Sequence, residues 1–146
     1  MTVPSEAALA AARRHWERVL GDAKTPDEVA LAADRMCAQL RAGLGRWIGD
    51  AGYRSLFERA LHVTRSDHPA LAELSFDAGD QVATSAEVRA HGTQEVAAGM
   101  VALVGTVIQL LGRIIGEEMA LRLVEHWGDR ARADIVSNDT EDGRDG

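Results

Sequence analysis

The sequence predicts an all-α protein, a bundle of five to six helices with a nearly all-apolar helix at its centre. Apolar residues recur at intervals of three and four along most of the chain, glycines and capping patterns divide it into helix-length segments, and one corner pattern occurs twice. Aromatic residues make up only 4% of the chain, whereas hydrophobic residues make up 46%. The core must therefore rest on Leu, Val, Ile and Ala, which suits closely packed helices.

The first two helices are marked by their ends. Residues 5–20 carry Leu9 and Trp16 at helical spacing, and Gly21 follows as a stop, while His15 is expected at the helix rim. The next helix opens with a capping box, in which Thr25 accepts from the backbone of Glu28 and Glu28 reaches back. Behind it an apolar stripe runs to about residue 48. The stripe consists of Val29, Ala32, Ala33, Met36, Leu40, Leu44 and Trp47.

The segments that follow complete the first half of the chain. Gly49 ends the second helix, and Asp50 offers an N-cap to a third helix that we expect to end near Val63. Pro69 opens a short segment, and residues 76–83, which contain Gly79 and several polar residues, are expected to connect the two halves.

The second half contains the predicted central helix. Residues 84–87 read TSAE, another capping pattern, and no proline follows before Trp127. Residues 96–112 carry no formal charge, and a helix that is apolar all round is either buried or spans a membrane. At about 1.5 Å per residue the stretch spans roughly 25 Å, less than the roughly 30 Å of a bilayer core. Because Arg113 follows at once, we favour a central helix over insertion.

A five-residue pattern occurs twice. Residues 46–50 read RWIGD and residues 113–117 read RIIGE. Each copy closes one helical pattern and opens another, which predicts two pseudo-repeated helix–corner–helix units. A structural corner is the favoured interpretation, with each arginine bonded to helix-end carbonyls or to the acidic residue of its own copy. The functional alternative makes Arg46, Trp47 and Arg113 interface candidates for an acidic ligand or a partner peptide.

Three glycines in the second half are further interface candidates. Gly105, Gly112 and Gly116 stand seven and four residues apart and so share roughly one helical face. Glycine costs a helix interior up to about 1 kcal/mol relative to alanine, so three of them indicate a packing reason. We expect a crossing within the chain, with the helix of the first copy. A homodimer seam is the alternative.

Metal binding is a weaker interpretation of the histidines. His62 follows Glu58, and His91 follows Glu87, at a spacing of four residues, which places each pair on one helical face. Facing helices could join such pairs, but carboxylate-bridged metal bundles carry Glu-x-x-His at a spacing of three. Exposed i,i+4 pairs are therefore favoured, and we expect no metal and no other cofactor.

Composition and motifs exclude several function classes. A formal charge of −7 would repel a phosphate backbone, so no nucleic-acid partner is expected. The chain lacks a Gly-x-Ser-x-Gly elbow and a P-loop, and GLGRWIG at residues 43–49 misses the dinucleotide spacing and has no strand ahead of it. Cys37 is alone, so no intramolecular disulfide can form, and its apolar neighbours predict a buried small hydrophobe. We expect no enzyme activity.

These observations lead to one functional prediction and two alternatives. We expect a single domain over residues 1–136, a disordered acidic tail over residues 137–146 and a cytoplasmic location, because the start lacks a secretory signal pattern. The predicted function is a non-catalytic interaction protein, an adaptor or regulatory subunit of a larger bacterial assembly or of a signalling or defence system, with a protein partner. The alternatives are a membrane-active protein that inserts its apolar hairpin, and a metal- or ligand-binding bundle that uses His62 and His91.

Overall fold

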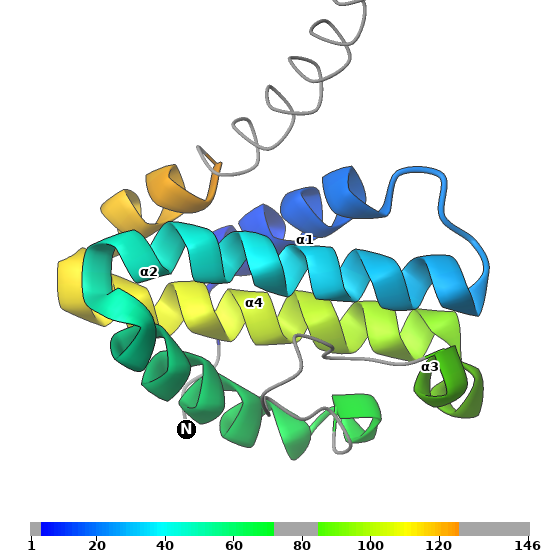
Figure 1. The fold of residues 1–146 in the computed structure, drawn as a ribbon. Coiled ribbons are helices and arrows are strands. Elements are labelled where there is room, and N and C mark those ends of the chain that lie inside the picture. The colour runs from blue at the N-terminus through cyan, green and yellow to red at the C-terminus, as the bar shows by residue number, and fades with distance from the viewer. Residues whose placement is uncertain (1–3, 72–84, 126–146) are drawn as a thin grey trace, which may run out of the picture.

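The computed structural model describes residues 4–71 and 85–125, and the regular elements of these residues are all helices (Figure 1). They are α1 (Glu6–Leu20), α2 (Pro26–Arg65), the 3-10 helix η1 (Pro69–Leu71), α3 (Ser85–His91), α4 (Thr93–Ile115) and a further helix over residues 117–125. The all-α prediction is confirmed for this part of the chain. Several predictions fall outside the described residues. They concern the connector at residues 76–83, Trp127 and the acidic tail, and also the TSAE pattern, whose side chains are not described.

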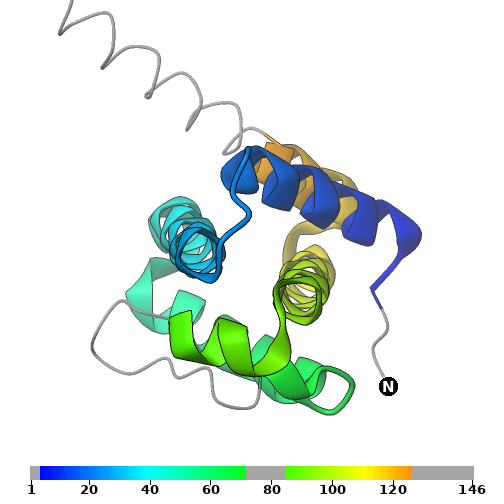
Figure 2. The same cartoon turned by 90° about the vertical axis from the view of Figure 1, so that its right-hand side faces the viewer.

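The helices are arranged in three layers. The first half of α2 and α4 lie side by side in the middle layer and run in the same direction (Figures 1 and 2). Helix α1 and helix 117–125 cover one side of this layer, and the second half of α2, η1 and α3 cover the other. Because the two central helices are parallel, the corners at their carboxyl ends lie at the same end of the molecule.

The predicted starts of α1 and α2 are confirmed in atomic detail. The Ser5 hydroxyl accepts from the backbone N–H of Ala8 at 3.1 Å and caps α1. In the capping box of α2, the backbone N–H of Glu28 donates to Thr25 Oγ1 at 3.2 Å, and the backbone N–H of Thr25 donates to Glu28 Oε1 at 3.4 Å. Each contact satisfies an N–H that the first helical turn leaves without an intrahelical acceptor.

The break at Gly49 is also confirmed, whereas a second break was not predicted. Gly49 interrupts α2 with φ 76° and ψ 167°, and the helix then continues to Arg65, two residues beyond the expected Val63. This second break is at Gly92, which separates α3 from α4 with φ 89°. The chain has no proline there, but glycine adopts a positive φ at no steric cost and can end a helix by itself.

Helix α4 supplies much of the core, as expected for the central helix. Its buried residues include Val96, Met100, Leu103, Ile108 and Leu111. Helix α4 is long and apolar enough to cross a membrane by length and composition, but 56% of its most apolar 18-residue window is buried inside the protein. Its apolar surface is therefore largely used in contacts with α1 and α2.

One member of the predicted apolar stripe is not in the core. The stripe from Val29 to Leu44 is buried, but the side chain of Trp47 is 60% exposed. Each helical residue is rotated by about 100° from the one before it, so Trp47 lies on the same side of α2 as the buried stripe. Its exposure is therefore not explained by a position on the outer side of the helix. The buried part of the stripe therefore ends at Leu44, and Trp47, which the sequence also made an interface candidate, lies at the surface.

Candidate interaction surface at the two corners

Both corners are built around a glycine that leaves the helical conformation. Gly49 has φ 76° and ψ 167°, and Gly116 has φ 95° and ψ 143°, a region of backbone space essentially restricted to glycine. The N–H of Gly116 donates to the carbonyl of Gly112 at 2.8 Å, and the N–H of Ala120 donates to the Gly116 carbonyl at 3.0 Å. One glycine therefore ends α4 and begins helix 117–125, and the structural role predicted for this corner is supported by its backbone.

Exposed apolar side chains gather around these corners. In the described part of the chain, four large hydrophobic residues are exposed: Leu31 at 50%, Trp47 at 60%, Ile114 at 64% and Met119 at 45%. Three of the four lie within five residues of a corner glycine, and only Leu31 lies near the start of α2, at the opposite end of the molecule (Figure 1). We call the exposed side chains of Arg46, Trp47, Ile114, Glu118 and Met119 the corner face.

Three members of the corner face, Ile114, Glu118 and Met119, were missed from the sequence. Ile114 follows Arg113 as Trp47 follows Arg46, so the internal repeat carried a signal for it. Met119 gave no such signal, because its exposure depends on how helix 117–125 is turned on its neighbours.

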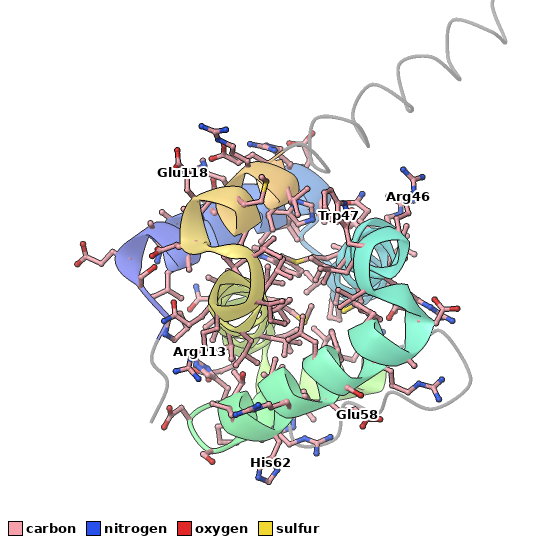
Figure 3. All side chains as sticks on the ribbon, turned by 90° about the vertical axis from the view of Figure 1, so that its left-hand side faces the viewer. Arg46, Trp47, Glu58, His62, Arg113 and Glu118 are labelled. Carbon is pink, nitrogen blue, oxygen red and sulfur yellow. The ribbon has the colours of Figure 1, made fainter. Side chains whose placement is uncertain are left out.

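Two polar contacts show which flank of helix 117–125 faces α1. Ser5 Oγ donates to Glu117 Oε1 at 2.7 Å, and Arg14 Nη2 forms an ion pair with Glu125 Oε1 at 2.8 Å, so this flank of helix 117–125 faces α1. Because each helical residue is rotated by about 100° from the one before it, Met119 lies roughly on the flank opposite Glu117 and Glu125. Figure 3 shows Trp47 between α2 and helix 117–125. Trp47 and Met119 therefore approach the same region from two different helices.

The two corner arginines are not brought together. Arg46 projects from α2 at one edge of the molecule, and Arg113 projects from α4 on the other side (Figure 3). Glu117, the predicted carboxylate partner of Arg113, accepts from Ser5 Oγ at 2.7 Å. Arg46 lies on the corner face, while Arg113, the other arginine predicted as an interface candidate, lies outside it.

The three candidate glycines do not form one packing face. A Cβ at Gly105 would lie 2.9 Å from Leu9 Cδ2, so this glycine packs against α1 and not against the helix of the first copy. A Cβ at Gly112 would lie 3.2 Å from the Cα of Glu117, within its own corner. Gly116 lies beyond the end of α4, and a Cβ there would meet no atom within 4 Å. The expected partner of the crossing was wrong, because α1 covers α4 at Gly105.

His15 lies in the core and not at the helix rim as expected. Its side chain is 2% exposed, and neither ring nitrogen has a hydrogen-bond partner among the described residues. Burial, with a smaller contribution from the charge of Arg18, lowers the pKa of His15 to about 4. The ring is therefore neutral at pH 7.

Cys37 and Tyr53 are buried and held in their protonated forms. Burial, followed by the charge of Asp34, raises the pKa of the Cys37 thiol, and burial is also the main cause that raises the pKa of Tyr53. The Tyr53 hydroxyl donates to the carbonyl of Cys37 at 3.3 Å across the corner of α2. The prediction that Cys37 is a buried small hydrophobe is confirmed, and its thiol is far from the reactive thiolate form.

The candidate metal ligands are not gathered into a site. Glu58 and His62 are exposed and point outward from the second half of α2 (Figure 3). His91 is half-buried at the end of α3, and the side chain of Glu87 lies outside the described residues. Within the part of the chain that the structure describes, no group of three or more His, Cys, Asp or Glu side chains is placed to hold a metal ion.

A shallow hollow lies between α1 and α4, and His68 also lines it. It has a volume of about 430 Å³, Arg13 and His68 at its rim, and walls that include Ala97, Ala98 and Ala102. Its small side chains leave it open to solvent, so it does not enclose a ligand as small-molecule sites usually do.

Comparison with protein families, curated proteins and solved structures finds no match for this chain. The functional interpretation therefore depends on the geometry of the corner face.

Proposed function

We propose that this protein is a non-catalytic interaction protein that binds a protein partner through the corner face, as an adaptor or regulatory subunit of a larger assembly. The observation that supports this proposal is the 60% exposure of Trp47, a residue in phase with the buried stripe of α2. Tryptophan is among the residues that contribute most to binding when a partner buries them. Exposed apolar groups that gather at one end of a protein are a mark of interaction sites.

The buried titratable groups favour binding over catalysis as the role of this chain. Reactive groups in enzymes lie in clefts with pKa values near the working pH. Here burial moves the pKa of His15 to about 4 and raises the pKa values of Cys37 and Tyr53, so each group is held uncharged inside the core. These groups contribute to packing and do not supply a general acid, a general base or a nucleophile.

We also propose that the two corners come from one repeated helix–corner–helix unit. The support is that both copies place a glycine of positive φ at the same position, with an exposed large hydrophobic residue two positions earlier. The unit would present Trp47 and Ile114 at the same end of the molecule, which gives the repeat a role in forming the interaction surface.

Site-specific photo-crosslinking in the native cell tests the proposed function. A photoreactive phenylalanine analogue replaces Trp47 in one variant and Leu31 in a matched control, since both are exposed hydrophobic residues of α2. We expect a discrete protein adduct from position 47 that is absent from position 31. Equal adducts, or none, from position 47 would contradict a specific surface at the corners.

A further inference from the structure

The corner face carries opposite charges on opposite sides of Trp47. In Figure 3, Arg46 projects from α2 on one side of Trp47, and Glu118 projects from helix 117–125 on the other. The Glu118 carboxylate accepts from Arg122 Nη2 at 3.0 Å, but the side chains of this i,i+4 pair are 84% and 71% exposed. Such exposed pairs are weak, so Glu118 remains accessible to another guanidinium.

The two corner segments have no net formal charge. Residues 46–50 and 113–122 contain three basic and three acidic residues, which are Arg46, Arg113, Arg122, Asp50, Glu117 and Glu118. The whole chain carries a formal charge of −7. Two copies of the chain therefore repel one another over most of their surface but meet no net repulsion where these two ends face each other.

We infer that the protein bound by the corner face is a second copy of this chain, related by a twofold axis that passes near Trp47. This inference rests on the proposed function and names its partner. A twofold interface is self-complementary, because every contact between two residues is repeated with the copies exchanged. Rotation about that axis places Arg46 of each copy beside Glu118 of the other, so the pair occurs twice.

The apolar centre of the corner face fits the same arrangement. Trp47 and Met119, which are 60% and 45% exposed, approach from α2 and from helix 117–125 and would be covered by the same two residues of the second copy. Interfaces usually have an apolar centre with aromatic residues and a polar rim. Here Trp47 and Met119 form the centre, and the two Arg46–Glu118 pairs form the rim.

Sedimentation equilibrium across the micromolar range tests the role of Trp47. We expect a reversible dimer for the wild type, a dimer dissociation constant raised at least about tenfold in Trp47→Ser, and no change in the matched Leu31→Ser variant. Circular dichroism checks that all three proteins keep their helices, since both replaced side chains are exposed. A wild type that stays monomeric up to the highest concentrations, or a Trp47→Ser variant that associates like the wild type, overturns the inference.

A mixing experiment tests the twofold charge pairing. Arg46→Glu and Glu118→Arg should each weaken the homodimer, because each variant places like charges opposite one another. In a mixture of the two variants, both pairs of the mixed dimer join opposite charges, so association should recover toward the wild-type level. A mixture that associates no better than the separate variants contradicts the pairing.

The failure of this inference can be told from the failure of the proposed function by the mass of the crosslinked adduct. An adduct of two copies from position 47 agrees with the dimer, whereas a position-47 adduct to a different protein, together with a monomeric wild type, removes the dimer and keeps the proposed function. The absence of a specific adduct at position 47 removes both.

Discussion

His15 shows most directly what a single buried group costs this fold. The sequence placed it at a helix rim beside Trp16, because an isolated helix pattern does not show how deeply α1 packs between its neighbours. The structure buries the imidazole and leaves both ring nitrogens without a partner among the described residues. A buried polar group without a hydrogen bond is destabilising, and a charged one more so.

Stability should therefore fall in acid through His15. Its folded pKa of about 4 lies below the unfolded value of 6.5, so the unfolded chain binds more protons between these pH values. The contribution of neutral His15 to the free energy of unfolding is fully present above pH 6.5. As the pH falls towards 4 this contribution is lost, and the free energy of unfolding falls by up to about 3 kcal/mol. Urea unfolding at several pH values should show this loss in the wild type, and a smaller one in His15→Met, which has no group to titrate there. Equal pH dependence in both proteins would mean that His15 is not protonated on unfolding.

At the scale of the helices, some features could be predicted from the sequence and others could not. Helix starts follow from local chemistry, so the capping box of Thr25 and Glu28 and the cap at Ser5 were predictable from a few neighbouring residues. The corner at Gly49 was predictable for the same reason, while Gly92 looked like any glycine within a helical pattern. Met119 could not be assigned to the surface, because exposure depends on which other helix covers each position.

The corner glycines should be sensitive to any added side chain. Gly49→Ala and Gly116→Ala each place a Cβ on a backbone with φ 76° or 95°, although no neighbouring atom would clash. Such strain costs about 1 to 3 kcal/mol. Thermal or urea unfolding should show a loss of this size in both variants.

Gly45→Ala is the matched control for the corner variants. Gly45 lies inside α2 and its added Cβ would meet only Asp50 Oδ1, at 3.4 Å, so the substitution should leave stability unchanged or raise it by up to about 1 kcal/mol. If all three variants behave alike, the corners impose no special backbone requirement, and the proposed repeat loses its main support.

At the scale of the whole molecule, the parallel course of the first half of α2 and of α4 decides where the two corners lie. The sequence predicted the central helix and the two corners but not that the corners meet at one end, because nothing local records the relative direction of two distant helices. That direction brings the exposed hydrophobic residues of both corners to one end, while most of the apolar surface of α4 is buried between the outer layers.

This arrangement predicts that the folded protein does not insert into membranes. Insertion of α4 would separate it from α1 and α2 and forfeit the burial of residues such as Met100, Leu103 and Ile108. A formal charge of −7 also opposes approach to anionic lipids. After co-sedimentation with neutral or anionic vesicles at neutral pH, we expect the protein in the supernatant. Sedimentation with the vesicles, together with protection of residues 93–115 from added protease, would instead show that α4 leaves the core, and the layered packing around it would then describe only the form free in solution.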